Sequence, residues 1–130
     1  MLYKNFGIQN NPPERQLCDH YVQIPNGYVA GSDRQEYYRS LARSYFAVSP
    51  DGFGVDCHRH WEALYFNCIP IVTKNTMTEF YSTLFPMVLV DSWVDFRMEQ
   101  YTLDLYNQLI GNFNKRMLDI DTYIKTVTKK

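Results

Sequence analysis

The residues best suited to chemistry lie in one stretch, where a glycine-containing turn leads into a helix. The turn runs from Ser49 through Gly52, Phe53 and Gly54. Glycines let a ligand approach main-chain N–H groups closely, and Asp56 stands where the following helix would have its N-cap. A helix start with free N–H groups is an anion site of the kind that a diphosphate needs. The turn therefore predicts a phosphate site, although a simple tight turn explains the glycines as well.

Two charged residues, Arg59 and Glu62, follow in the helix, three positions apart. The Arg59 guanidinium can donate two N–H groups to phosphate oxygens, and Glu62 can accept hydrogen bonds from the two hydroxyls of a ribose. We expect this pair to take part in catalysis and in ligand binding, whereas a surface ion pair is the alternative. His58 can donate to a phosphate or sugar oxygen, or bond only to the backbone or water.

The run Cys57-His58-Arg59-His60 raises the question of a metal site. Side chains at these positions of one helix do not converge on an ion, and no second pair of ligands has zinc spacing. We therefore expect neither a metal nor a resident cofactor.

The elements that must position this stretch alternate between strands and helices. Short apolar runs predict strands at 2–8, 21–24, 45–48, 69–72 and 86–90. Helical spacing and caps predict helices at 13–20, 35–43, 56–66, 75–84, 95–110 and 114–127. This order predicts an α/β fold with a mostly parallel sheet and helices on both faces. Ligands of such sheets bind at the carboxyl ends of strands, near the point where the strand order reverses, and the turn after Val48 is such an end.

Helical spacing also assigns residues to the core and to caps. Trp61, Leu64, Tyr65 and Cys68 form an apolar stripe that we expect to pack on the sheet. Ser32 or Asp33 is expected to cap the helix at 35–43, whose apolar positions are Tyr37, Tyr38 and Leu41.

Length and composition indicate one globular domain over residues 1–130. The predicted elements divide it into a core at 1–94 and helices at 95–130. Of the 130 residues, 45% are hydrophobic and 21% charged, and the net charge is −1. No basic arm or RNA-binding signature is present, so we expect no nucleic-acid partner. Three cysteines without a pairing pattern indicate reduced thiols. The sequence predicts neither a signal peptide nor a membrane span, and the compartment stays open.

The glycine turn and its helix resemble a known family. Exostosin-like glycosyltransferases have a donor-site segment that is similar to FAVSPDGFGVDCHRHWEAL at 46–64 and CIPIV at 68–72. A looser likeness extends over about residues 2–93. The chain departs from the family pattern at Asp51, where a basic residue is often found, and at Asn67, where glycine is usual.

This resemblance implies a Rossmann-like three-layer α/β/α domain, the donor-binding half of the two-domain architecture called GT-B. It implies metal-independent transfer of a sugar from a nucleoside-diphosphate sugar to a glycan or protein acceptor. The acceptor site and the catalytic base would belong to an amino-terminal domain. By matching position, Arg59 would bind the phosphates and Glu62 the ribose, while Ser49, Gly52 and Gly54 would shape the pocket. A catalytically inactive nucleotide-binding or interaction module with the same fold is the alternative.

Overall fold

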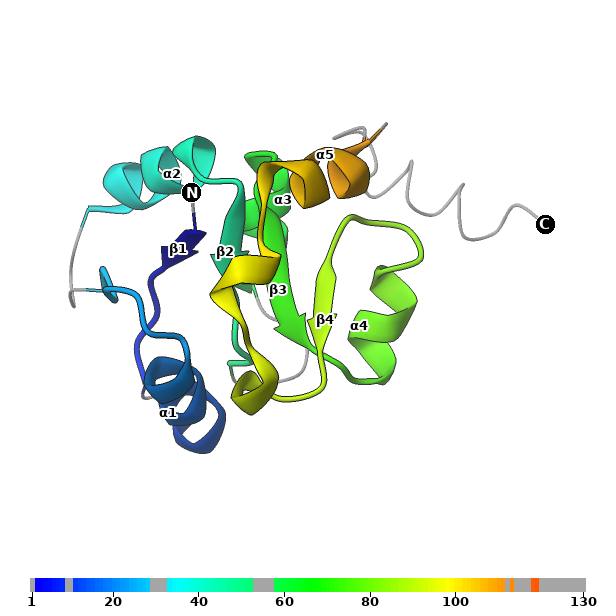
Figure 1. Cartoon of the computed structure of the whole chain (residues 1–130). Helices are drawn as coiled ribbons and strands as arrows, with labels where there is room; N and C mark the ends of the chain where they lie inside the picture. Colours follow the sequence, from blue (N-terminus) through cyan, green and yellow to red (C-terminus); the bar gives the residue numbers. More distant parts are fainter. Residues whose placement is uncertain are drawn as a thin grey trace.

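Four short parallel strands form the centre of the fold, and they lie side by side in chain order, β1-β2-β3-β4 (Figure 1). The computed structural model describes residues 2–8, 11–28, 33–52, 58–111, 113 and 118–119. The strands are β1 (Leu2–Lys4), β2 (Phe46–Val48), β3 (Ile69–Thr73) and β4 (Val88–Val90). Phe46 pairs with Leu2 on one side and with Ile69 on the other, in parallel register. The prediction of a Rossmann-like α/β fold with a parallel sheet is confirmed.

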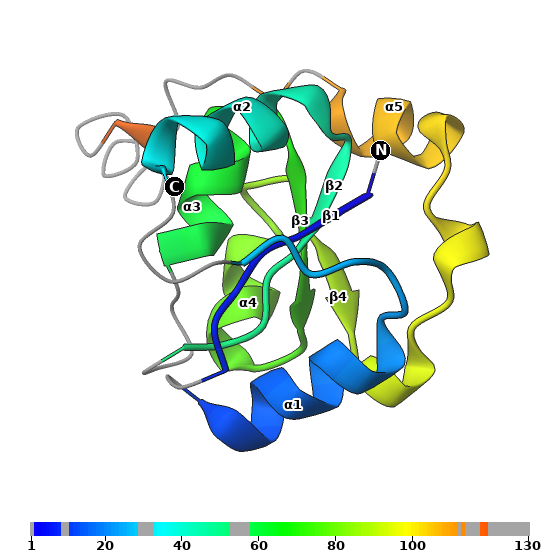
Figure 2. The same ribbon diagram turned by 90° about the vertical axis from the view of Figure 1, so that its left-hand side faces the viewer.

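Helices cover both faces of this sheet. One face carries α2 (Arg34–Arg43), α3 (His58–Tyr65) and α4 (Thr76–Tyr81), and the other carries the 3-10 turns η1 (Trp93–Asp95) and η2 (Met98–Gln100) and helix α5 (Leu103–Ile110). Because successive strand residues point to opposite faces, Phe46 and Val48 lie in one apolar cluster and Ala47 in another. Figure 2 shows the two helical layers on either side of the sheet and α1 (Pro12–Tyr21) beneath it.

Local sequence explains where several helices begin and end. The Asp33 carboxylate accepts from the N–H of Gln35 at 2.9 Å and caps α2, as predicted. At the end of α3, Asn67 has a φ of 58°, the left-handed conformation that asparagine tolerates better than most residues. Gly111, with a φ of 37°, ends α5.

The strand predicted at 21–24 is wrong. Tyr21 is the last residue of α1, and the N–H of Val22 bonds to the carbonyl of Cys18. The N–H of Ile24, which would point to the same side of a strand as that of Val22, bonds to the carbonyl of Val22 at 2.9 Å. These local bonds use N–H groups that a strand would offer to a neighbouring strand. Apolar character here reflects burial of Val22 in the core and not strand pairing.

The helix predicted at 95–110 is also interrupted, because it consists of η1, η2 and α5. Phe96 and Tyr101 are buried and stack at a centroid distance of 5.1 Å. Thr102 then caps α5 by accepting from the N–H of Leu105 at 3.2 Å. The helix predicted at 114–127 falls almost entirely outside the described residues. Within the described part of the chain, no helix has the length and apolarity that crossing a membrane requires.

Candidate functional site

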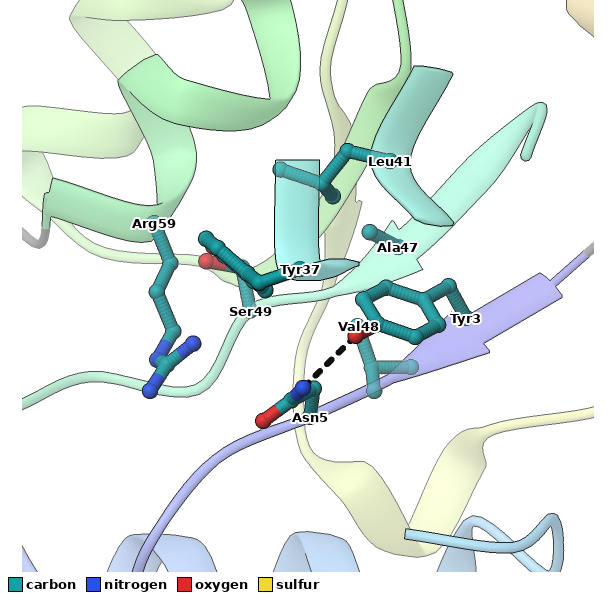
Figure 3. Close-up of a pocket in the computed structure, with 8 residues that line it drawn as sticks. All are labelled: Tyr3, Asn5, Tyr37, Leu41, Ala47, Val48, Ser49 and Arg59. Atoms are coloured by element: carbon teal, nitrogen blue, oxygen red, sulfur yellow. Dashed lines mark hydrogen bonds between the residues drawn. The ribbon is translucent and has the colours of Figure 1, made fainter. Parts of the chain in front are cut away.

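A small pocket opens where the end of β2 meets the start of α3. Its walls come from β1 and the residues after it, α2, β2 and α3, as Figure 3 shows. The lining residues are Tyr3, Asn5, Tyr37, Leu41, Ala47, Val48, Ser49 and Arg59. The enclosed space in it amounts to about 10 Å³, which is room for about one water molecule. Small-molecule sites usually measure roughly 300–1,000 Å³, so a nucleotide sugar would have to extend far beyond this pocket.

Arg59 and Ser49, two of the predicted site residues, line this pocket together. The Arg59 guanidinium lies over the ring of Tyr37, 5.3 Å from its centroid, which is a cation–π arrangement. Arg59 is half-buried, and in Figure 3 its side chain extends from α3 at one side of the labelled residues, next to Tyr37 and Ser49. An aromatic ring beneath a guanidinium restricts its motion while leaving its N–H groups able to donate.

Glu62 lies one helical turn further along α3 and faces α2. Its carboxylate oxygens accept hydrogen bonds from the Tyr37 hydroxyl at 3.0 Å and the Tyr38 hydroxyl at 3.3 Å. Burial raises the pKa of the Tyr37 hydroxyl above its ordinary value, so this group stays a donor. Glu62 is not among the residues that line the pocket, and its two tyrosine partners belong to the contact between α2 and α3.

The other predicted site residues are distributed differently. Gly52 is buried after β2, and His58 is exposed at the first position of α3. Phe53, Gly54 and Asp56 lie outside the described residues, as does Cys57. The structure therefore brings Ser49 and Arg59 together and leaves the central part of the glycine turn undescribed.

A buried polar cluster lies directly behind Ser49. The Ser49 hydroxyl and His60 Nδ1 share a hydrogen bond of 2.6 Å, and both side chains are almost completely buried. On the other side of the imidazole, His60 Nε2 lies 3.9 Å from Asp51 Oδ1. Ser49 and Asp51 thus face opposite ring nitrogens of one histidine on α3.

Asp51 occupies an environment that disfavours its charge. Burial, followed by the nearby Glu14 carboxylate, raises the pKa of Asp51 to about 6, although a hydrogen bond from Thr73 and the charge of Arg15 act in the opposite direction. The Thr73 hydroxyl bonds to Asp51 Oδ2 at 3.5 Å. Among the described residues, none donates a hydrogen bond to Asp51 Oδ1.

Helix α1 lies across the carboxyl ends of the strands and borders this cluster. Arg15, which is buried, donates to the carbonyl of Gly7 after β1 at 2.7 Å and to the carbonyl of Asp51 after β2 at 3.0 Å. Glu14 accepts from the indole N–H of Trp93, which follows β4, at 2.7 Å. One helix therefore joins the ends of three strands.

The strand order corrects one expectation about the site. The described strands follow one another as β1-β2-β3-β4, so their order does not reverse anywhere in this sheet. The turn after Val48 is a carboxyl end, as predicted, but it lies between β1 and β3 and not at a reversal point.

Sequence patterns could have identified some of the residues that were missed. On α3 the buried face comprises His60, Ala63 and Leu64. Of the predicted stripe, Leu64 and Cys68 are fully buried, whereas Tyr65 is 58% exposed and Trp61 only half-buried. Helical spacing from Ala63 and Leu64 would have placed His60 inside, where an imidazole needs a polar partner.

The tyrosines and Asn5 have weaker signals. Tyr37 and Tyr38 were assigned to the core, yet a half-buried tyrosine usually bonds through its hydroxyl, which points to a polar partner on a neighbouring element. Asn5 donates to the Tyr3 hydroxyl at 2.6 Å, a contact that no sequence spacing predicts (Figure 3).

The cysteines and the metal-binding residue types complete the survey of the described side chains. Cys18 and Cys68 are buried free thiols, as expected, and burial raises the pKa of Cys68 to about 12. Within the described ranges, no three His, Cys, Asp or Glu side chains converge in a way that would hold a metal ion.

Comparison with known proteins adds no family assignment, because no protein-family model and no curated protein matches the chain.

Proposed function

We propose that the chain binds a nucleoside-diphosphate sugar at the start of α3, as the donor-binding half of a glycosyltransferase. The observation that carries the proposal is the position of Arg59, which lines one pocket with Ser49 at the carboxyl end of β2. The resemblance of residues 46–64 to exostosin-like enzymes supports the same position for the donor.

The phosphates would lie against Arg59. The first turn of a helix has N–H groups without partners inside the helix and a positive dipole end, so an anion is stabilised there. Arg59 belongs to this first turn, and the Tyr37 ring restrains its guanidinium. A diphosphate would accept paired hydrogen bonds from the guanidinium and neutralise its charge.

The ribose would lie towards Glu62. Tyr37 and Tyr38 hold the two carboxylate oxygens in a fixed orientation. Each carboxylate oxygen can accept more than one hydrogen bond, so a ribose hydroxyl can still bind. In this arrangement the two tyrosines position the carboxylate and limit the entropy that ligand binding would otherwise cost.

A second candidate, a nucleotide-binding or interaction module without transferase activity, has one observation in its favour. The Glu62 carboxylate is held by two tyrosines at the contact between α2 and α3 and is absent from the pocket lining. A carboxylate whose main role is to join two helices would need no ligand.

Calorimetry with the whole chain tests binding. UDP-glucose, GDP-mannose and ADP-glucose would be titrated in metal-free buffer with chelator. We expect saturable binding of one donor, weakened about 10- to 100-fold by Arg59→Ala, because charge-assisted hydrogen bonds are worth about 1.5–3 kcal/mol. Arg39→Ala, which removes an exposed guanidinium from α2, is the matched control and should leave the affinity unchanged.

The same titrations separate the two candidates. A Glu62→Ala variant that folds but binds the donor about tenfold more weakly supports the ribose contact, since a hydrogen bond to a charged group has about this value. Turnover of the bound donor, by transfer or by hydrolysis, would then distinguish an enzyme from a binding module. If none of the three donors binds, the proposed function is wrong.

A further inference from the structure

Three polar side chains, those of Asp51, His60 and Ser49, follow one another behind the pocket. Asp51 Oδ1 faces His60 Nε2 at 3.9 Å, and His60 Nδ1 shares a 2.6 Å hydrogen bond with the Ser49 hydroxyl. Ser49 lines the pocket, whereas His60 is fully buried and Asp51 largely so. The imidazole and the hydroxyl therefore connect Asp51 to the pocket, beside the direct electrostatic effect of its charge.

We propose that Asp51 and His60 hold one proton between them, and that this proton determines whether the Ser49 hydroxyl donates to an anion in the pocket. Asp51 and His60 would be positioning residues for the ligand, and Ser49 would contact it. The proposal rests on the proposed function only for the identity of the anion, because the proton and the hydroxyl belong to the free protein.

With the shared proton present, both arrangements of the pair place a hydrogen on His60 Nδ1. Either Asp51 is protonated and its O–H points towards Nε2, or Asp51 is a carboxylate facing a doubly protonated imidazole. In both cases Nδ1–H donates to the Ser49 oxygen. The hydrogen of the Ser49 hydroxyl is then available to donate to a phosphate oxygen in the pocket.

Without the shared proton, the direction of the hydrogen bond reverses. The Asp51 carboxylate, 3.9 Å away, favours the tautomer with its hydrogen on Nε2. Nδ1 then has no hydrogen and accepts a hydrogen bond from the Ser49 hydroxyl. Only lone pairs of Ser49 remain towards the pocket, and an anion is repelled both by them and by the net negative charge of the pair.

The groups around Asp51 determine the pH at which the shared proton is lost. Among the described residues, the charged groups that face Asp51 are Glu14 and Arg15 of α1 and His60 of α3, while Thr73 of β3 supplies a hydroxyl. Burial first, and then Glu14, raises the pKa of Asp51 to about 6, which supports a proton that is lost as the pH rises through this range. An anionic ligand should therefore bind more tightly below pH 6 than above it.

The free protein provides the first test. The ring nitrogens of His60 would be followed by ¹⁵N NMR from pH 4.5 to 8.5 in the wild type and in Asp51→Asn, which keeps the shape of the side chain and removes its ionisation. We expect Nδ1 to change from hydrogen-bearing to acceptor as the pH rises through about 6, and the midpoint to move by at least about one pH unit in the variant. Equal midpoints in the two proteins would overturn the proposal.

The ligand provides the second test. UDP-glucose, GDP-mannose and ADP-glucose have diphosphates that stay fully ionised between pH 5 and 8, so any change in affinity over this range comes from the protein. We expect the wild-type affinity to fall about tenfold as the pH rises from about 5 to 7.5, the linkage expected of one coupled proton. Asp51→Asn should give a flat profile, and Asp91→Asn, which changes an exposed carboxylate outside the cluster, should keep the wild-type profile.

Ser49→Ala separates the hydroxyl from a purely electrostatic effect of Asp51. This variant should bind weakly at all pH values and lose most of the pH dependence, while the NMR midpoint of His60 stays near the wild-type value. An Asp51→Asn profile as steep as that of the wild type would contradict the proposal. Failure of all three donors to bind would count against the proposed function, and the NMR titration would still decide whether the proton is shared.

Discussion

Asp51 has a carboxyl group that the folded chain keeps protonated more readily than the unfolded chain does. Its pKa is raised from 3.8 to about 6, mainly by burial. A carboxyl group whose pKa is raised in the fold contributes its full stability at low pH, and this contribution is lost as the pH rises between about 4 and 6. At pH 8 the buried charge should lower the free energy of unfolding by roughly 2 kcal/mol relative to pH 4.

Asp51→Asn should therefore be more stable than the wild type at pH 8 and nearly equal to it at pH 4. Urea unfolding followed by circular dichroism at the two pH values measures this difference. Asp91→Asn is the control, because its carboxylate is exposed. A variant that is less stable than the wild type at pH 8 would show that the Asp51 charge is favourable in the fold.

At the scale of elements, the contact between α2 and α3 depends on polar bonds as well as on packing. Tyr37 and Tyr38 donate to the two oxygens of Glu62, and the Tyr38 ring stacks on Phe66 with centroids 5.1 Å apart. Leu41 and Ala63 are buried beneath them. These bonds hold α2 against α3, and both helices contribute residues to the pocket.

Replacing both tyrosines by phenylalanine keeps the rings and removes the two hydroxyls. The Tyr37→Phe, Tyr38→Phe double variant should lose about 1–3 kcal/mol of unfolding free energy, because Glu62 keeps its half-buried charge without these donors. Tyr28→Phe, at an exposed position, is the control. Chemical denaturation measures the loss, and an unchanged midpoint would mean that water replaces the hydroxyls at no cost.

Sequence patterns predicted most elements but not their contacts. The parallel strands and the starts of α1 and α2 follow from apolar runs, from prolines and from the Asp33 cap, all of which are local signals. The strand at 21–24 failed because local N–H bonds of Val22 and Ile24 compete with pairing. The association of Ser49 with His60 depends on how α3 packs on the sheet, and spacing along the chain does not encode this packing.

At the scale of the whole molecule, α1 covers the carboxyl ends of the strands, where ligands often bind in open parallel sheets. Arg15 is the main connection, since its guanidinium binds carbonyls after β1 and β2 while lying buried over Phe6. The carbonyls that Arg15 binds belong to Gly7 and Asp51, two positions beyond Asn5 and Ser49, which line the pocket between α2, α3 and β1.

Arg15→Lys should destabilise the whole domain, because an ammonium group cannot span two carbonyls as the planar guanidinium does. We expect a loss of about 2 kcal/mol, the value of one or two hydrogen bonds from a charged donor. Thermal unfolding measures it, with the exposed Arg43→Lys as the control. Equal melting temperatures for the two variants would show that Arg15 does not secure α1.

The position of the donor can be tested directly by mapping it on the protein. Amide ¹H–¹⁵N spectra of the whole chain would be recorded while the best-binding nucleoside-diphosphate sugar is added. We expect the largest shifts at Ser49, Gly52 and the first turn of α3 up to Arg59, with small shifts on α4 and α5. Shifts that centre on any other surface, or a spectrum that does not change with any donor, would contradict a diphosphate site at this helix start.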